Sequence, residues 1–455
     1  MVVLQGTQRV NNRGHLEVGG CDATELAAAF GTPLYVVDEV ELRRRCRRYR
    51  QALHASYSNS SVAFAGKALL NLAIARIVAE ENLELDVASG GELYTALQAG
   101  FPVQRITLHG NFKLDEELRL ALRHGVGRIG IDSLDEIERL ARLSEEMHCS
   151  PRVTLRVAPG VDPHTHGKIS TGQDDTKFGL NISNGAARAG IQAILRHPHL
   201  QLAGFHCHVG SQLLDTEAHE AAADIVCRFA ASMQERYGMR VQEIILGGGL
   251  GIQYLPGQQP PSIERFADSI CDTFRRSCQN MGLGEPHLGV EPGRSIAGEA
   301  GLTLYTIGPV KRVPIREVPG ERWYVAVDGG LSDNPRPLMY DALYQTLLAN
   351  RAAEMPTITV RVSGRHCETD TLLPAVELPE PHPGDILAVL ATGAYNASMA
   401  SNYNRFPRPA MVLANEGNAE LITRRETFED LLKLDLIPER LRQKAIASQG
   451  CDKGE

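Results

Sequence analysis

Ionisable side chains and glycines follow a series of short apolar runs in the first two thirds of this 455-residue chain. Each run has the length and composition of a β-strand. The residues that follow the runs are, in chain order, Lys67, Asp86, His109, Asp132, Arg156, His208, Gly247 to Gly249 and Glu291. If the runs are parallel strands of one barrel, their carboxyl ends share a rim, where such barrels carry functional groups. The pattern therefore predicts an active site on that rim.

Lys67 comes directly after an apolar run and one glycine, at residues 63–66. Burial disfavours the charged form of a lysine, so a lysine in this position can present a free amine. Such an amine attacks carbonyl groups and forms Schiff bases. A lysine that extends from a strand end into solvent is an equally good interpretation of this residue alone.

A glycine turn at residues 247–251 follows the seventh run, and Glu291, Gly293 and Arg294 follow the eighth. Successive glycines let backbone N–H groups surround a phosphate, although tight turns use glycines too. Arginine binds phosphate or carboxylate groups with two hydrogen bonds. A carboxylate such as Glu291 can keep an aromatic ring nitrogen protonated, so that the ring accepts electrons from a carbanion.

His206 and His208 lie two residues apart and face the same side of the sixth run. They are candidates for a metal pair, but no third ligand accompanies them at a recognisable spacing. Stacking of His208 on a planar cofactor is the better interpretation, with Ser211 at a phosphate.

Two polar stretches stand out nearer the C-terminus. Residues 364–370 place Cys367 beside two carboxylates, and residues 391–404 form a polar loop with two tyrosines. A single cysteine is most often a buried structural residue, but Cys367 could also be a nucleophile or a proton donor. The tyrosine-containing loop could cover a ligand or be an ordinary surface loop.

Eight β-like runs alternate with helix-length amphipathic segments between residues 62 and 291, which predicts parallel βαβ units. The runs span residues 62–65, 85–87, 105–108, 128–131, 153–157, 202–207, 243–246 and 288–290. Eight units in about 250 residues are typical of a (β/α)₈ barrel of the TIM type. An open, doubly wound sheet is the alternative.

After residue 302 the strands have no regular helices between them, which predicts a mostly antiparallel β domain. Its runs span residues 302–307, 323–327, 357–362, 386–390 and 411–414. Runs at 16–18 and 34–37 could complete the same domain, and residues 427–436 predict a helix. The expected domains are an α/β barrel over residues 42–302 and a β domain over residues 1–41 and 303–455.

Composition excludes several classes of protein. The net charge of −8 argues against a nucleic-acid surface. Nine scattered cysteines form no C-x-x-C pair, which argues against a disulfide framework and favours a reducing cytoplasm. We also expect no signal peptide and no membrane span, because no basic leader or long apolar segment is present.

Several motifs, taken in order, resemble a known family. They are DVASGGEL at residues 86–93, ISTG at 169–172 with KFG at 177–179, and SMASNYN at 398–404 with PRP at 407–409. Over residues 30–432 the chain resembles the diaminopimelate decarboxylase family of the fold-type-III, alanine-racemase-like pyridoxal-phosphate enzymes.

The resemblance implies roles for matching positions. Lys67 would form the Schiff base with pyridoxal 5'-phosphate, His208 would stack on its ring, and Glu291 would pair with its ring nitrogen. The residues implied to bind the cofactor are Lys67, Asp86, His208, Ser211, Gly248, Gly249, Glu291, Gly293, Arg294 and Tyr395. The residues implied to bind substrate are Arg294, Arg336, Tyr340, Glu368 and Tyr395. No metal is implied.

The implied reaction is loss of CO₂ from meso-2,6-diaminopimelate to give L-lysine, the last step of lysine biosynthesis. Cys367 would donate the proton across the interface of a homodimer with shared active sites. The substrate's distal end carries both charges, and Arg336 with Glu368 supplies the matching pair.

Two motifs depart from the family pattern. Residues 65–69 read AGKAL, where Val usually precedes the lysine and Asn stands two residues after it; residues 367–370 read CETD, one residue shorter than usual. Alternatives therefore remain: a sister decarboxylase for ornithine, arginine, carboxynorspermidine or a carrier-bound residue, a racemase, or a non-catalytic homologue. Arg336 favours diaminopimelate, because simple diamines lack a distal carboxylate. Cys367 in its motif argues against a racemase, and the presence of both Lys67 and Cys367 argues against a non-catalytic homologue.

Overall fold

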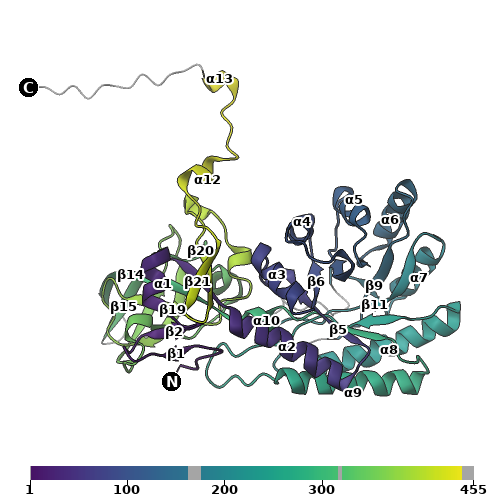
Figure 1. Ribbon diagram of the computed structural model, residues 1–455, viewed down its shortest axis with the longest axis horizontal. Coiled ribbons are helices and arrows are strands. Elements are labelled where there is room, and N and C mark those ends of the chain that lie inside the picture. Colours follow the sequence, from purple (N-terminus) through teal and green to yellow (C-terminus); the bar gives the residue numbers. More distant parts are fainter. Residues whose placement is uncertain (1, 162–175, 316–319, 443–455) are drawn as a thin grey trace, which may run out of the picture.

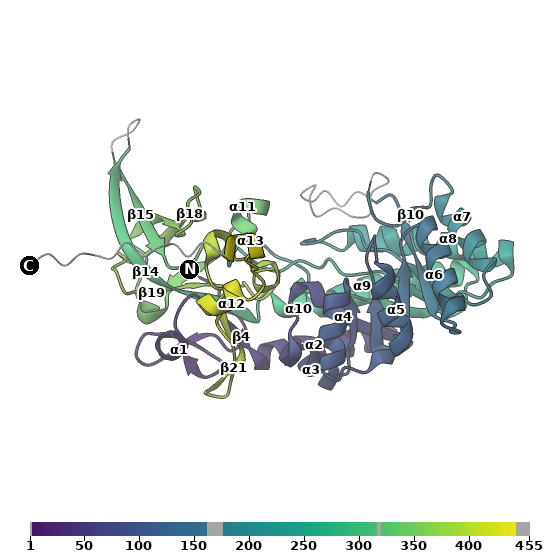
Figure 2. The same cartoon turned by 90° about the horizontal axis from the view of Figure 1, so that it is seen from above.

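The computed structural model describes residues 2–161, 176–315 and 320–442. A β/α lobe and a β lobe lie side by side along the long axis, and the last helices extend away from the β lobe (Figures 1 and 2). The ISTG motif at residues 169–172 lies outside the described residues.

Eight parallel strands close into a barrel in the first lobe. They are β5 (Ser60–Ala65), β6 (Glu84–Val87), β7 (Ile106–Leu108), β8 (Arg128–Ile131), β9 (Arg152–Ala158), β11 (Gln201–His206), β12 (Glu243–Ile245) and β13 (His287–Val290). Parallel pairing of β13 with β5 and of β8 with β9 closes the ring. The short β10 (Leu180–Asn181) pairs with β9 outside it.

Closure confirms the predicted barrel and excludes the open sheet. Every predicted barrel strand begins and ends within two residues of the observed one. The agreement has a physical cause: strands buried on both faces read as continuous apolar runs, and these runs are easily recognised.

Helices cover the outside of the barrel with their apolar faces inward. They are α2 (Glu39–Ser56), α3 (Leu72–Glu80), α4 (Gly90–Gln98), α5 (Asp115–His124), α6 (Leu134–Glu146), α7 (Ala186–Leu195), α8 (Glu217–Tyr237) and α9 (Ile263–Met281). The short α10 (Arg294–Ala297) follows β13, and all four of its residues are buried. Asn71, Ser89 and Ser133 cap three of the outer helices, each accepting a hydrogen bond from a first-turn N–H. The caps fix where each helix leaves the rim. Within the described chain, no helix is long and apolar enough to cross a membrane.

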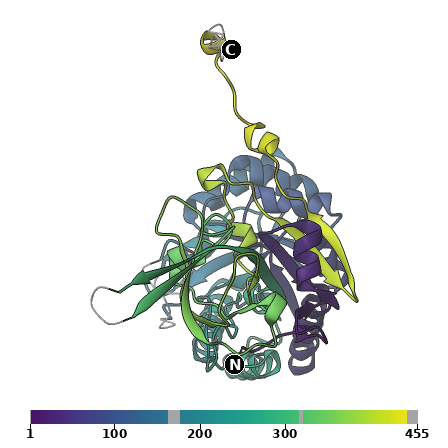
Figure 3. The same ribbon diagram turned by 90° about the vertical axis from the view of Figure 1, so that its left-hand side faces the viewer.

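The β lobe has a mixed sheet in which antiparallel pairs predominate. Its strands are β14 (Gly301–Pro314), β15 (Glu321–Val327), β16 (Thr346–Leu348), β17 (Ile358–Ser363), β18 (Thr371–Leu378), β19 (Ile386–Val389), β20 (Ala410–Asn415), β21 (Asn418–Thr423) and the N-terminal β4 (Leu34–Asp38). β4 lies between β14 and β20, so the N-terminal segment does complete this lobe. Viewed end-on, the lobe lies in front of the barrel (Figure 3).

Smaller elements surround the β lobe. β1 (Arg9–Val10), β2 (Leu16–Val18) and β3 (Cys21–Asp22) form a separate sheet beside α1 (Ala23–Phe30). The helix predicted over 427–436 was too long: α12 (Phe428–Leu432) ends earlier, and α13 (Glu439–Arg442) follows Pro438. The apolar residues of this segment are exposed, so a longer helix would have no core to pack against.

Candidate active site

A cavity of about 280 Å³ lies at the carboxyl ends of the barrel strands, beneath residues of the β lobe. The residues that line it are Ala65, Lys67, Asp86, Ala88, His109, Gly110, Arg156, Phe178, His206, His208, Ser211, Gly248, Gly249, Glu291, Gly293, Arg294, Arg336, Tyr340, Tyr395 and Met399. All ten positions predicted for the cofactor are among them, as are all substrate positions except Glu368. The predicted catalytic Cys367 is also absent from this lining within the described chain.

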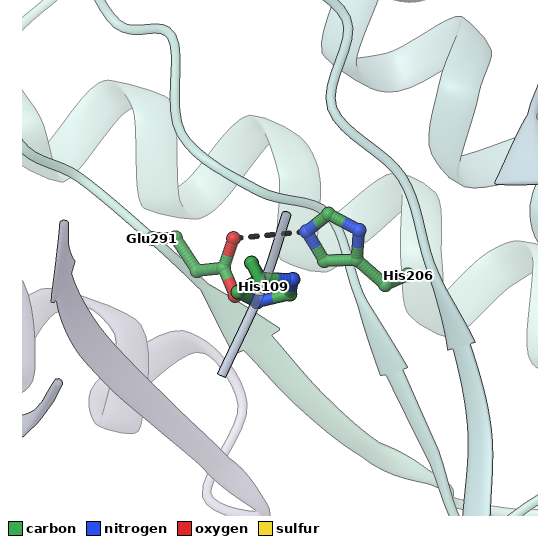
Figure 4. A group of neighbouring side chains, drawn as sticks. All are labelled: His109, His206 and Glu291. Carbon is green, nitrogen blue, oxygen red and sulfur yellow. Dashed lines mark hydrogen bonds and ion pairs between the residues drawn. The ribbon is translucent and has the colours of Figure 1, made fainter. Parts of the chain in front are cut away.

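Glu291 lies at the end of β13, between two histidines (Figure 4). Its Oε1 is 3.0 Å from Nε2 of His109, and its Oε2 is 2.9 Å from Nε2 of His206. The two rings lie against each other with centroids 4.4 Å apart. The ligand atoms of these three residues lie within 4.8 Å of one another, as in a metal site, but here they are joined directly by hydrogen bonds.

The histidines determine the charge of Glu291. Burial favours the neutral acid, but His109 and His206 outweigh it and hold the pKa of Glu291 well below its usual range. Burial lowers the pKa of His206 to about 4, so His206 is neutral near pH 7. Glu291 is therefore an anion held by two ring nitrogens, and it can pair with a protonated aromatic nitrogen.

Lys67 and Asp86 extend from neighbouring strands, since Ala65 of β5 pairs with Asp86 of β6. The Lys67 side chain lines the cavity, which the protein largely encloses. Burial lowers the pKa of Lys67, but Tyr395 and Asp86 outweigh this effect, so the pKa is raised. The shift is therefore opposite to the one that burial alone would give. Burial also raises the pKa of Asp86. Oδ1 of Asp86 lies 4.0 Å from Nε2 of His109.

The glycine turn after β12 lies against the end of β13. A Cβ at Gly248 would stand 2.1 Å from the backbone oxygen of Glu291, so only glycine fits there. Gly249 has φ +126°, which side chains disfavour. The Gly248 N–H donates to Nδ1 of His208 over 3.2 Å, and burial lowers the pKa of His208 well below its usual value. The His208 ring is therefore neutral and fixed in orientation.

Arg294 supplies the positive charge near the glycine turn. Its Nη1 donates to the Tyr254 hydroxyl at 2.7 Å and its Nη2 to the Ser211 hydroxyl at 2.9 Å. Its Nε is buried and has no hydrogen-bond partner within the described residues. The guanidinium also lies 4.8 Å from the centre of the Tyr395 ring. A buried arginine with spare donor capacity is suited to bind an anion.

Arg336 enters the cavity from α11 (Arg336–Tyr340) in the β lobe. Its Nε donates to the Tyr344 hydroxyl at 3.0 Å, and its guanidinium lies 5.2 Å from the ring centre of Tyr340 and 5.6 Å from that of Tyr395. The guanidinium keeps further donors, which can bind a carboxylate.

Sequence reasoning missed Tyr254 and Tyr344, whose hydroxyls orient the two arginines. Tyr254 follows the glycine turn closely and Tyr344 stands four residues after Tyr340, so their positions were the only available signal. His109 and His206 were noted as strand-end residues, but their contact with Glu291 was not foreseen.

Cys367 and Glu368 lie on a β-lobe loop and are both exposed. The Glu368 carboxylate accepts a hydrogen bond from the Tyr403 hydroxyl at 2.5 Å, and the Cys367 N–H donates to Oδ1 of Asn404 at 3.3 Å. The structure therefore joins the thiol loop to the tyrosine-containing loop.

A buried pair shapes the shortened thiol loop. Nδ1 of His366 lies 2.6 Å from Oδ2 of Asp370, and the same oxygen accepts the His366 N–H. Asp370 has φ +36°, and its carboxylate is buried, where it also accepts a hydrogen bond from the Leu331 N–H. Thus the loop closes on itself while Cys367 and Glu368 remain outside.

The donor set of the cavity fits an anionic, aromatic cofactor. The glycine turn leaves room for a close approach, Arg294 has an unpaired buried donor, and Lys67 offers an amine. Glu291 lines the cavity as an anion. Together these residues suit a phosphate at one end and a protonated ring nitrogen at the other.

Comparisons with known proteins identify the family of this chain. The family model for the pyridoxal binding domain of pyridoxal-dependent decarboxylases matches residues 39–298. Diaminopimelate decarboxylase of Bacillus subtilis is 46% identical, covering 95% of this chain and 98% of that protein. The Staphylococcus aureus enzyme is 42% identical, covering 94% and 99%. A crystal structure of diaminopimelate decarboxylase from M. jannaschii with L-lysine has a TM-score of 0.88 at 35% identity, covering 96% and 99%.

The closed barrel, the β lobe and the matched model define a pyridoxal-dependent decarboxylase. Within that class, the chain belongs to the diaminopimelate decarboxylase family.

Proposed function

We propose that this enzyme removes CO₂ from meso-2,6-diaminopimelate and releases L-lysine, as the last step of lysine biosynthesis. The observation that carries the proposal is the meeting of Lys67, Glu291 and Arg336 in one cavity. These residues come from three distant segments, and each meets a different need of the reaction.

Pyridoxal 5'-phosphate, when bound, supplies an aromatic ring that accepts the electrons released with CO₂. Lys67 would offer the amine to which the cofactor's aldehyde attaches. Glu291, anionic between His109 and His206, would pair with the ring nitrogen and keep it protonated. The glycine turn, Ser211 and Arg294 would hold the phosphate, and His208 would contact the ring.

Arg336 binds the distal carboxylate of the substrate. Its Nε is engaged by Tyr344, so the remaining guanidinium donors are available to the ligand. Tyr340 and Tyr395 flank the guanidinium and limit its motion. Because ornithine and arginine lack a distal carboxylate, this arginine favours diaminopimelate over them.

Cys367 donates a proton to the product carbon, and Glu368 binds the distal ammonium. Both are exposed, and neither lines the cavity of its own chain within the described residues. We therefore assign them to the cavity of a second copy, in a homodimer with shared active sites. Burial of that interface would also exclude water around the reacting carbon. The reaction is placed in the cytoplasm, in keeping with the free thiols of the described cysteines.

The test uses purified protein incubated with pyridoxal phosphate and meso-diaminopimelate, with CO₂ and L-lysine measured. L-ornithine, L-arginine and L-lysine are tested separately as alternative substrates, with CO₂ as the measured product. We expect CO₂ only from diaminopimelate, with lysine formed beside it, and a visible absorbance band that borohydride removes while attaching the cofactor to Lys67. Turnover of another amino acid in place of diaminopimelate would contradict the substrate. Failure to bind the cofactor would contradict the enzyme class.

A further inference from the structure

His219 lies behind the glycine turn, on the side away from the cavity. It belongs to α8, which packs outside the barrel, and its side chain is 1% exposed. Its Nε2 lies 3.0 Å from the backbone oxygen of Gly248. The ring also meets the edge of Phe266, with centroids 5.0 Å apart. The function proposed above gives this histidine no role.

The hydrogen bond defines the tautomer of His219. A carbonyl oxygen only accepts, so Nε2 carries the proton. Burial lowers the pKa of His219, so the ring is neutral near pH 7 and Nδ1 is unprotonated. That Nδ1 atom is buried without a hydrogen-bond partner in the described chain. An unpaired buried nitrogen is costly, so a purely structural position would favour an apolar ring such as phenylalanine.

The carbonyl oxygens of Gly247, Gly248 and Gly249 each have their own donor. The Gly247 oxygen accepts from the Glu291 N–H at 2.7 Å, and the Gly249 oxygen accepts from the Leu213 N–H at 3.0 Å. The oxygen between them, on Gly248, is held by the His219 side chain. The orientation of the central peptide thus depends on one imidazole.

That orientation determines where the Gly249 N–H points. In a planar trans peptide the N–H is opposite the C=O. Since His219 holds the Gly248 oxygen on the α8 side, the Gly249 N–H is directed toward the cavity, which Gly248 and Gly249 line. Within the described residues, this N–H has no acceptor.

We propose that His219 is a positioning residue for the phosphate group of the cofactor. It prevents rotation of the peptide between two glycines, whose backbone is otherwise the most permissive in the chain. The Gly249 N–H is thereby oriented toward the cavity before a phosphate binds, so binding does not have to order this peptide. The inference rests on the proposed function, because it requires a phosphate at this turn.

The test compares ligands with and without the phosphate. His219→Phe keeps the aromatic contact with Phe266 but removes the donor, and His219→Gln restores an N–H. Affinities for pyridoxal phosphate and for pyridoxal are measured by absorbance titration, and affinity for inorganic phosphate by calorimetry. Phe266→Leu is the matched control, since it alters the same packing and leaves the hydrogen bond.

For His219→Phe we expect binding of pyridoxal phosphate to weaken about tenfold or more, while pyridoxal binding stays within about twofold. The affinity for inorganic phosphate should fall by a similar factor. His219→Gln should recover much of the loss, and Phe266→Leu should lower Tm without changing the ratio of the two affinities.

Equal weakening of both ligands, or no weakening of either, would overturn the role of His219. If the unaltered protein binds phosphate but not pyridoxal phosphate, and His219→Phe weakens phosphate, the positioning role stands and the proposed cofactor falls. If it binds neither ligand, both proposals fall.

Discussion

The rings of Tyr254 and Tyr344 meet edge to face, with centroids 5.4 Å apart and an angle of 87° between the planes. The first hydroxyl is bonded to Arg294 and the second to Arg336. Tyr254 follows the glycine turn of the barrel, whereas Tyr344 belongs to the β lobe. The tyrosine pair thereby maintains the spacing of two cationic groups across the boundary between lobes.

Replacing Tyr344 with phenylalanine should weaken substrate binding. The ring contact is kept, but Nε of Arg336 loses its acceptor and the guanidinium becomes more mobile. We expect KM for meso-diaminopimelate to rise about fivefold, as for the loss of one hydrogen bond, with kcat changed less. Steady-state kinetics measure both constants. Tyr94→Phe, at a position 57% exposed, is the matched control; an unchanged KM with a reduced kcat would contradict the assigned role.

Replacing Glu291 with glutamine should slow the reaction and leave the fold intact. The amide keeps the shape of the carboxylate but carries no charge to hold a protonated ring nitrogen. We expect kcat to fall about 10²- to 10³-fold, the usual effect of removing one stabilising group at a reacting centre. Glu264→Gln, which alters a surface carboxylate bonded to Arg48, should have little effect. A kcat within a few fold of the original enzyme would argue that the charge of Glu291 is dispensable.

Mixing two inactive variants tests the shared active site. Lys67→Ala and Cys367→Ala should each lose activity alone. If Cys367 acts in the partner's cavity, a hybrid dimer has one doubly altered site and one intact site. After denaturation and joint refolding, random pairing should restore about a quarter of the original activity. No recovery, despite hybrid dimers detected by mass spectrometry, would mean that both residues act within one chain.

Asp22 should contribute to stability in a pH-dependent way. Burial favours its neutral form, but hydrogen bonds from Thr24, His15 and Asn11 outweigh it and lower the pKa from 3.8 to about 2. Since the folded pKa is below the ordinary value, the stabilisation is present above about pH 4 and is lost as the pH falls toward 2.

Asp22→Asn should therefore lower the free energy of unfolding at pH 7 by about 2 kcal/mol. The difference from the original protein should shrink between about pH 4 and pH 2, the interval between the two pKa values. Urea unfolding at several pH values measures it. A difference that is the same at every pH would show that the charge of Asp22 is not responsible. Asp272→Asn, on the exposed face of α9, is the control.

Much of the fold could be predicted because its signals are local. The barrel strand at residues 128–131 was predicted with its observed bounds, since an apolar run between polar segments needs no distant information. The β lobe was harder to predict. Its strands β18 and β21 were missed, because Pro374 interrupts the apolar residues of β18 and most of β21 is exposed and polar. The helix predicted over residues 427–436 was too long for a related reason, since periodicity does not reveal whether a core is present to receive it.

The residues of the site likewise divide into those that local patterns could predict and those that they could not. Lys67, Asp86, His208 and Glu291 were found together because the carboxyl ends of parallel strands must share one rim. The histidines around Glu291, the tyrosine pair and the contact of His219 with the glycine turn could not be found. These contacts join residues 29 to 182 positions apart in the chain, and no pattern over a short window reports them.

The sequence by itself determined the alternation of strands and helices, the residue types on the rim and the resemblance to one family. Only the tertiary structure decided which groups are charged and which side chains are fixed in position by contacts with other residues. Lys67 illustrates the difference, because burial acts on it as expected while Tyr395 and Asp86, brought close by the fold, reverse the direction of its pKa. Residue type and local pattern are encoded along the chain, whereas electrostatic environment depends on distances that exist only after the chain has folded.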